Sequence, residues 1–369
     1  MAERDYWLGF SVFSGIGPIK FKKLLEQFNS AKDAWNASVL DLSEVIGEKL
    51  AEKFDKYRDA FSVSNYARRF LNEGVSFLIL TDKDYPKLLS QIKNPPFVLY
   101  TRGNFDFNLL EHQNTIAVVG SRKTTQYGRE VTKILVEELA SAGFTIVSGL
   151  AIGVDAISHK TAIDNNVKTI AVLGCGVDCC YPLANKNIYN SIVQGSGAVI
   201  SEVPLGFAPS RGSFPARNRI IAGLSLGVLV TEGAEDSGSL ITAGYAVKFG
   251  HPVFAVPGPI TSSLSKGPYK LLERGAKIVT KVEDIINELG IMGIKSVTSA
   301  TGRRGTANIK GENKGENMIL EILQNEPLHF DEILRRTGLQ SSRIGSILSV
   351  MEVKGMVRSL EGGGFEICR

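Results

Sequence analysis

The stretch TIAVVGSRKTTQYGREVTKILVEELASAGFTIV, residues 115–147, contains two short apolar runs with a helical pattern between them. The runs are residues 115–119 and 144–147, and the apolar stripe between them comprises Val131, Ile134, Leu135 and Leu139. Similar runs recur on both sides, at residues 76–80, 97–100, 169–173, 198–201, 227–231 and 252–256. Near-continuous apolar strands separated by helices are typical of a parallel sheet covered on both faces. The sequence therefore predicts a doubly wound, mostly parallel α/β domain over residues 73–289.

The segment before this domain, residues 1–72, has helical rather than alternating periodicity. Its apolar positions include Leu8 and Val12, and then Phe21, Leu24, Leu25 and Phe28. Between these two groups lies the turn Ser14-Gly15-Ile16-Gly17-Pro18, with the proline placed to begin a helix. The turn resembles that of a helix-hairpin-helix motif, whose backbone N–H groups hold a phosphate. An ordinary connector between two helices is the alternative interpretation.

The segment after the domain divides into a linker and a small module. Residues 290–316 lose the periodicity and are rich in Gly, Ser, Thr, Lys and Asn, as expected for a flexible linker. Residues 317–369 contain three short helical patterns, at 318–323, 330–337 and 341–354, followed by the glycines 362–364 and a final apolar run. Three helices and a hairpin predict a winged-helix module.

Composition limits the classes of protein to which this chain can belong. With 42 Lys and Arg against 38 Asp and Glu among 369 residues, the net charge is +4. A hydrophobic fraction of 43% and a charged fraction of 22% exclude disorder throughout the chain. The small net charge excludes binding of nucleic acid by bulk charge, so any such binding requires a local patch.

Cysteine usage and the absence of long apolar runs indicate a cellular compartment. Three of the four cysteines, Cys175, Cys179 and Cys180, lie close together, unlike those of a secreted disulfide scaffold. No second cysteine cluster follows at the spacing of a zinc site, so we expect these thiols to act as small apolar side chains in the core and not as metal ligands. Neither a signal-peptide core nor a run long enough to span a membrane is present. We expect a soluble, cytoplasmic protein with no metal.

Candidate anion-binding groups follow the predicted strands, where ligands bind in open parallel sheets. Gly120-Ser121-Arg122 precedes a helix that begins near Tyr127, and it combines close backbone approach, a hydroxyl and a guanidinium. Ser148-Gly149 and Ser237-Gly238-Ser239 open similar turns. Lys186 either reaches a phosphate or is an ordinary solvated residue at a helix start. Asp155 is placed to cap a helix, and His159 is interpreted as structural, since no nucleophile accompanies it.

The densest basic segment covers residues 211–219 and contains Arg211, Arg217, Asn218 and Arg219. Together with Phe214 it could bind the backbone of a single strand and stack on a base. The alternative is internal pairing of the arginines with carboxylates such as Glu202 and Glu232. The predicted turns together form a groove rich in donors and poor in catalytic groups, which favours binding over bond cleavage.

Several of these segments together resemble the DNA-processing protein A family (DprA, also called Smf). The matching stretches are GSR at 120–122, SGLAIGVD at 148–155 followed by His159, YPLAN at 181–185, FPARNRIIAGLS at 214–225, GSLITA at 238–243 and VPG at 256–258. The resemblance implies a Rossmann-like core with an N-terminal helical domain, of the SAM or helix-hairpin-helix type, and a C-terminal winged helix. Two positions depart from the family pattern: Ile152 replaces an arginine, and Tyr269 replaces an asparagine.

The same resemblance implies a function. It indicates a non-enzymatic protein without a cofactor that protects incoming single-stranded DNA and loads the recombinase RecA onto it during natural transformation, acting as a homodimer. By similarity, Arg122, Ser148-Gly149, Lys186, Arg217-Asn218 and Ser237-Gly238 would line the phosphate pocket. The sequence does not locate the dimer surface or the RecA contact.

Two other functions fit parts of the sequence. The first is a nucleotide phosphoribohydrolase of the "lonely guy" group, but the segment from Thr231 to Thr242 lacks that group's glycine-rich motif and catalytic glutamate. The second is a duplex-binding regulator acting through its winged helix, where Arg335, Arg336 and Arg343 could face DNA.

Overall fold

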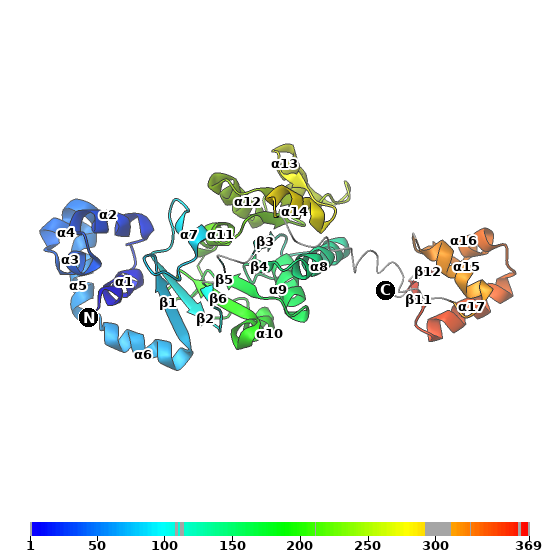
Figure 1. Cartoon of the computed structure of the whole chain (residues 1–369), viewed down its shortest axis with the longest axis horizontal. Coiled ribbons are helices and arrows are strands. Elements are labelled where there is room, and N and C mark those ends of the chain that lie inside the picture. The colour runs from blue at the N-terminus through cyan, green and yellow to red at the C-terminus, as the bar shows by residue number, and fades with distance from the viewer. Residues whose placement is uncertain are drawn as a thin grey trace. The chain divides into compact units, whose positions relative to one another are not determined.

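The computed structural model describes residues 2–107, 110, 114–210, 212–291, 311–324, 326–360 and 363–367. Arg211 and most of the predicted linker, residues 292–310, lie outside the described residues. The chain divides into two compact units, Met1–Ile294 and Lys295–Arg369 (Figure 1). The predicted helical segment and the predicted sheet domain thus belong to one unit, with apolar side chains of both in a shared core.

The N-terminal segment is helical, as predicted. Its helices are α1 (Glu3–Val12), α2 (Pro18–Phe28), α3 (Ala31–Asn36), α4 (Val39–Ile46), α5 (Glu48–Ala60) and α6 (Val63–Glu73). Pro18 is the first residue of α2, which confirms the predicted helix start after the turn at residues 14–18. An aromatic cluster stabilises the helices: the Phe10 and Phe54 rings stack with centroids 4.8 Å apart, and Trp35 packs edge-on against both.

Among the described residues, nine strands form one sheet in the order β1-β2-β6-β5-β4-β3-β7-β8-β9. Their bounds are β1 Val75–Ile79, β2 Val98–Arg102, β3 Thr115–Val119, β4 Thr145–Ser148, β5 Thr169–Val172, β6 Gly197–Ser201, β7 Val228–Val230, β8 Val253–Ala255 and β9 Lys277–Ile278. The strands from β6 to β9 in this order are parallel. The predicted doubly wound, mostly parallel sheet is confirmed.

Helices cover both faces of the sheet (Figure 1). They are α7 (Lys87–Ser90), α8 (Gln126–Ser141), α9 (Val154–Asp164), α10 (Lys186–Ser191), α11 (Ser213–Gly223), α12 (Gly238–Phe249), α13 (Lys266–Glu273) and α14 (Val282–Leu289). Alternate strand residues such as Ala117 and Val119 pack against α11 and α12, while α8, α9 and α10 lie on the opposite side (Figure 1).

One edge of the sheet departs from the parallel arrangement. β1 pairs with β2 and β2 pairs with β6, both antiparallel. The apolar runs at 76–80 and 97–100 predicted these strands but carried no information about direction, because a buried strand looks alike in either sense. The short elements α7 and β9 were not predicted. β9 has only two residues, of which Ile278 alone is apolar, so it lacks the apolar run on which the strand predictions rest.

The second unit has the elements of a winged helix, as predicted. They are α15 (Lys314–Leu323), β10 (Leu328–His329), α16 (Phe330–Thr337), α17 (Ser341–Val353), β11 (Val357–Leu360) and β12 (Gly364–Ile367). α15 begins four residues before the predicted helix at 318–323, because Asn313 caps it through a hydrogen bond from the Glu316 N–H. In the part of the chain that the structure describes, no helix is both long enough and apolar enough to cross a membrane.

Candidate functional site

The topology of the sheet places one strand end at the point where the strand order reverses. From β3 the chain continues to β4, β5 and β6 on one side, whereas the later strands β7, β8 and β9 lie on the other side. The crevice beyond the carboxyl end of β3 is the position at which open α/β sheets bind ligands. Gly120, Ser121 and Arg122 occupy this position, directly after β3.

The backbone of this turn is held by its neighbours on both sides. The Ser121 N–H donates to the carbonyl oxygen of Glu232 at 2.7 Å, and the Ser121 carbonyl accepts from the Val154 N–H at 3.1 Å. The Ser121 hydroxyl donates to the Lys123 carbonyl and accepts from the Lys123 N–H, both at 3.0 Å. A Cβ at Gly120 would lie 2.6 Å from the Glu232 carbonyl oxygen, so only glycine fits there. Ser121 therefore shapes the turn, and Arg122 projects from it.

An open pocket of about 480 Å³ lies beside this turn and is lined by three cations, Arg122, Lys123 and Arg129. We call it the basic pocket. All three are exposed, and none forms an ion pair with a carboxylate among the described residues. The α8 N-terminus lies at the same place, where its partial positive charge adds to theirs. Sequence reasoning missed Lys123 and Arg129, although both follow the same strand end within the first eight residues after Ser121. The pocket can bind a phosphate through charged hydrogen bonds.

One aromatic ring lies next to Arg122, and a second ring packs against the first. Its guanidinium carbon is 5.8 Å from the centroid of the Phe214 ring, and the Tyr181 and Phe214 centroids are 5.6 Å apart. Tyr181 is 45% exposed, so a face of this pair is open to solvent. Phe214 belongs to the first turn of α11 and brings part of the basic segment 211–219 to the basic pocket. Cations beside a half-buried ring and an exposed ring suit a single strand, whose bases stack while its phosphates are neutralised.

Arg217 and Asn218 lie elsewhere, buried beneath the strand ends. Arg217 Nη1 donates to the carbonyl oxygen of Gly149 at 2.6 Å and also to that of Val172. Burial lowers the pKa of Arg217, and the nearby Asp155 opposes this shift. Asn218 donates to the carbonyl oxygen of Gly238 at 3.2 Å. Both side chains therefore hold loops in place, and neither presents its polar group to solvent.

The loop at Ser148-Gly149 is equally enclosed. The Ser148 hydroxyl is fully buried and donates to the Val118 carbonyl at 2.7 Å. Asp155 accepts from the N–H groups of Gly149 and Ala151 at 3.1 and 3.3 Å, so it holds this loop and does not cap α9, whose N-cap is Gly153. Burial raises the pKa of Asp155, whereas Arg217 and the two N–H donors lower it.

The remaining predicted residues divide between exposed and paired positions. Lys186 begins α10 and is exposed, with no ion pair among the described residues. Ser237 caps α12 through a bond from the Ser239 N–H, and Gly238 is exposed beside it. Arg219 pairs with Glu202, as the internal-pairing alternative stated. Glu232 pairs with no arginine among the described residues, and its carboxylate instead accepts from the Thr125 N–H and hydroxyl at 3.0 and 2.5 Å.

Comparison with known proteins identifies the family. The profile described as DNA recombination-mediator protein A matches residues 76–290, and that of the DprA winged helix domain matches residues 306–363. The chain belongs to the DNA recombination-mediator protein A family. Protein Smf of Synechocystis, a curated relative, is 35% identical over 98% of this chain and 98% of its own length. The family predicted from the motifs is therefore confirmed.

Two solved structures of DNA processing protein A are similar to this member of the family. The one from Streptococcus pneumoniae is 35% identical, with a TM-score of 0.68 over 78% of this chain and 97% of that chain. The one from Helicobacter pylori is also 35% identical, with a TM-score of 0.52 over 58% of this chain and 95% of that chain. These similarities agree with the arrangement of the sheet domain.

His159, Cys175, Cys179 and Cys180 of this family member occupy buried or partly buried positions. His159 is fully buried, and burial lowers its pKa to about 3, with Arg217 contributing. Burial raises the pKa of Cys175 to about 12, and the proximity of Cys179 adds to the shift. Both groups are therefore uncharged at neutral pH. Within the described part of the chain, no group of three or more His, Cys, Asp or Glu side chains could hold a metal ion.

The two departures from the family pattern have different surroundings. Ile152 is 43% exposed on the loop before α9, so it leaves an apolar side chain where the family pattern has a positive one. The Tyr269 hydroxyl donates to the Gly258 carbonyl, and the Tyr127 hydroxyl donates to the neighbouring Pro257 carbonyl at 2.5 Å. Tyr269 therefore takes part in fixing the turn after β8.

Proposed function

We propose that this protein binds single-stranded DNA, without enzymatic activity, at the basic pocket beyond β3. The observation that carries the proposal is the group of exposed cations Arg122, Lys123 and Arg129 beside the Phe214 and Tyr181 rings. The Helicobacter pylori structure, which concerns the single-stranded DNA binding mode of that protein, supports it.

The arrangement favours a single strand because phosphates and bases would be contacted together. Arg122 can bind a phosphate while its guanidinium plane and the Phe214 ring offer a stacking surface to the next base. Bases are free to stack on a protein only when they are not paired with a second strand. Lys186 and the exposed Gly238 backbone extend the candidate surface along the strand ends.

We further propose that the bound strand is handed to RecA by a homodimer of this protein during natural transformation. Family membership supports this proposal, as do the relatives named DNA processing protein. The test is recombinase loading onto strands precoated with single-strand-binding protein, which should proceed faster when this protein is added. An unchanged loading rate would contradict it.

Binding itself is tested by fluorescence anisotropy with a labelled oligothymidylate. Arg122→Ala should weaken binding several-fold, because one charged contact with phosphate is lost. Lys133→Ala serves as a control, since Lys133 is an exposed cation of α8 that pairs with Glu137 at 3.7 Å. Equal affinities of wild type and Arg122→Ala would remove Arg122 from the site. Release of free base from nucleoside monophosphates would contradict the absence of enzymatic activity.

A further inference from the structure

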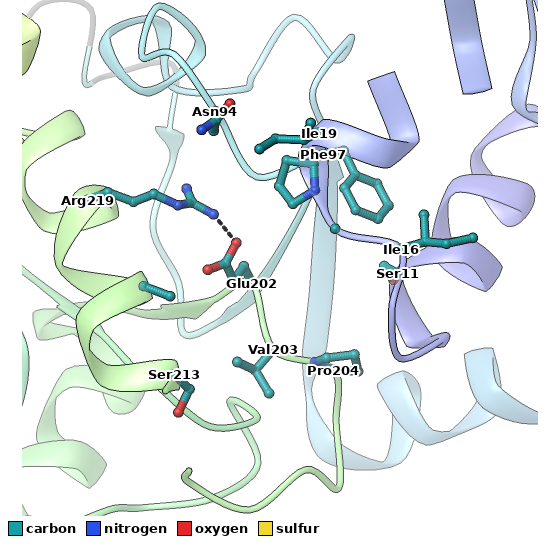
Figure 2. A pocket seen from close by; sticks show the side chains of 13 residues that line it. Ser11, Ile16, Ile19, Asn94, Phe97, Glu202, Val203, Pro204, Ser213 and Arg219 are labelled. Atoms are coloured by element: carbon teal, nitrogen blue, oxygen red, sulfur yellow. Dashed lines mark hydrogen bonds and ion pairs between the residues drawn. The ribbon is translucent and has the colours of Figure 1, made fainter. Parts of the chain in front are cut away.

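A second cavity, of about 440 Å³, lies between the helical segment and the sheet domain (Figure 2). The turn between α1 and α2 forms one wall, and the start of α11 and the segment after β6 form the other. Its lining residues are Ser11, Ile16, Gly17, Pro18, Ile19, Asn94, Phe97, Glu202, Val203, Pro204, Ser213, Ala216 and Arg219, none of which lines the basic pocket. The turn at residues 14–18 thus contributes to a cavity wall.

Most of the lining is apolar, and the Arg219–Glu202 ion pair provides its charged groups. Figure 2 shows Arg219 and Glu202 pointing toward each other, with Phe97, Ile16 and Ile19 across the cavity. The Arg219 side chain is 11% exposed and that of Glu202 20% exposed, so water screens this pair only partly. The pair is neutral overall, and the cavity therefore does not attract a phosphate.

The polar side-chain groups of the cavity that lack a partner among the described residues are Glu202 Oε1, the Asn94 amide and Arg219 Nη1, of which Arg219 Nη1 is buried away from solvent. Glu202 accepts from Arg219 through Oε2, whereas its Oε1 accepts no hydrogen bond among the described residues. The Ser11 hydroxyl donates to the Leu8 carbonyl at 2.7 Å, and the Ser213 hydroxyl donates to that of Gly174 at 2.5 Å. The Asn94 side chain, which is half-buried, makes no hydrogen bond within the described residues. A ligand would therefore meet a carboxylate oxygen that only accepts, and an amide.

α11 connects this cavity to the basic pocket. Ser213 lines the cavity, and the next residue, Phe214, lies under the Arg122 guanidinium. A strand that stacks on Phe214 would thus pass the mouth of the cavity within the first turn of α11. A volume of about 440 Å³ lies within the range of about 300–1,000 Å³ typical of small-ligand pockets, and its apolar walls suit the faces of a planar ring.

We propose that the cavity receives one base of the bound strand and selects a base with an exocyclic amino group, whose N–H donates to Glu202 Oε1. Cytosine, adenine and guanine carry such a group, whereas thymine offers only its ring N3–H, which lies between two carbonyl oxygens that the carboxylate repels. The inference rests on the proposed single-strand binding and adds base preference to it. The lining shares no residue with the basic pocket, so the two can be tested separately.

The test compares oligodeoxycytidylate with oligothymidylate of equal length, using the full-length protein and fluorescence anisotropy at neutral pH. Wild type should bind the cytidylate about 5- to 10-fold more tightly, as expected for one charge-assisted hydrogen bond. Glu202→Gln should abolish the preference. Arg219 can only donate, so it would hold the amide oxygen and turn the amide NH2 toward the cavity, where it can donate to a thymine carbonyl and to cytosine N3 or O2 alike but accepts from neither base.

A second variant leaves the ion pair intact. Ala216→Trp fills the cavity from α11 and should bring the two affinities to the same value while oligothymidylate binding stays close to that of wild type. Glu130→Gln is the matched control for Glu202→Gln, because Glu130 is exposed and, within the described residues, its side chain bonds only to Gln126. This control should keep the wild-type preference.

The outcomes separate this inference from the proposed function. Equal binding of both oligonucleotides by wild type overturns the base preference, and so does a preference that persists in Ala216→Trp, as it would if the cavity held a peptide of a partner protein. In either case, oligothymidylate binding that depends on Arg122 would leave the proposed function standing. Failure of wild type to bind either oligonucleotide overturns both.

Discussion

The Nη1 atom of Arg217 lies 2.6 Å from the carbonyl oxygen of Gly149 and ties α11 to the loop that follows β4. Asp155 accepts from the N–H of the same glycine at 3.1 Å. The Gly149 residue is therefore held at its N–H by a carboxylate and at its carbonyl by a guanidinium. Because both charged groups are buried, each depends on the other and on these backbone contacts. The loop beside the basic pocket is thus fixed before any ligand arrives.

Gly149→Ala should break this arrangement. A Cβ at residue 149 would overlap the Arg217 guanidinium, which is buried and has no room to move aside. We expect a loss of about 2–4 kcal/mol in the free energy of unfolding, from overpacking and from the disturbed buried pair. Gly244→Ala in α12 is the control, since its Cβ would meet nothing within 4 Å. Urea denaturation checks both, and equal stabilities of the two variants would contradict the role of Gly149.

Arg122 and Arg217 should differ in their effect on the salt dependence of DNA binding. An exposed arginine that contacts phosphate releases a counterion, so Arg122→Ala should reduce the slope of log affinity against log salt by about 0.7. Arg217→Met should leave the slope unchanged and lower the stability instead, because this arginine contacts backbone carbonyls. Anisotropy titrations at several salt concentrations measure the slopes. A reduced slope in Arg217→Met would show that Arg217 contacts phosphate directly.

The sequence predicted the sheet and the position of Arg122 because both depend on local patterns. Apolar runs define the strands, and a Gly-Ser-Arg turn after a strand is recognisable by itself. The burial of Arg217 and Asn218 also had a signal that was not used. They lie three and four positions before the buried Ile220, Ile221 and Ala222, on the same side of α11. Charge alone suggested an exposed cluster.

Other features depend on contacts between distant segments and could not be predicted from the sequence. Glu202 and Glu232 were both considered as partners for the arginines of the basic segment. Glu202 pairs with Arg219, whereas Glu232 bonds to Thr125, 107 residues away in the chain. The antiparallel edge formed by β1 and β2 likewise follows from tertiary pairing, as does the cavity between the helical segment and α11. Side-chain periodicity does not encode these relations.

Thr125 should stabilise the start of α8. Its hydroxyl accepts from the Gly128 N–H at 3.0 Å and donates to Glu232 at 2.5 Å, so Thr125→Val removes a helix cap and a donor to a buried carboxylate. We expect a loss of about 1–3 kcal/mol in the free energy of unfolding. Thr124→Val is the matched control, because no hydrogen bond of the Thr124 side chain is found within the described residues. Thermal or urea unfolding distinguishes the variants, and equal losses would contradict the assignment.

The winged helix offers fewer free cations than its sequence suggests. Arg336 bonds to Glu332 and Glu326, and Arg335 also bonds to Glu332, whereas Arg343 on α17 has no ion pair among the described residues. We therefore expect Arg336→Ala to change affinity for duplex DNA by less than about two-fold, since its charge is already neutralised. Arg343→Ala is the matched variant and should have the larger effect. A larger loss in Arg336→Ala would indicate that this arginine leaves its partners to contact DNA.

His159 should make the stability depend on pH in a defined direction. The Thr169 hydroxyl donates to the Ile146 carbonyl at 2.8 Å, so His159 Nδ1 must donate to that hydroxyl. Nε2 is left as a buried acceptor that has no partner among the described residues. The pKa of about 3 in the folded protein lies below the ordinary value of 6.5, so the unfolded chain binds a proton first as the pH falls. The contribution of neutral His159 to the free energy of unfolding is therefore fully present above pH 6.5 and is lost as the pH falls toward 3. The loss between pH 7.5 and pH 5 is about 2 kcal/mol. His159→Asn keeps a donor for Thr169 but does not titrate. Between pH 7.5 and pH 5, the free energy of unfolding of the wild type should therefore fall by this amount more than that of the variant. Parallel curves from urea denaturation across this range would show that His159 is not the group responsible.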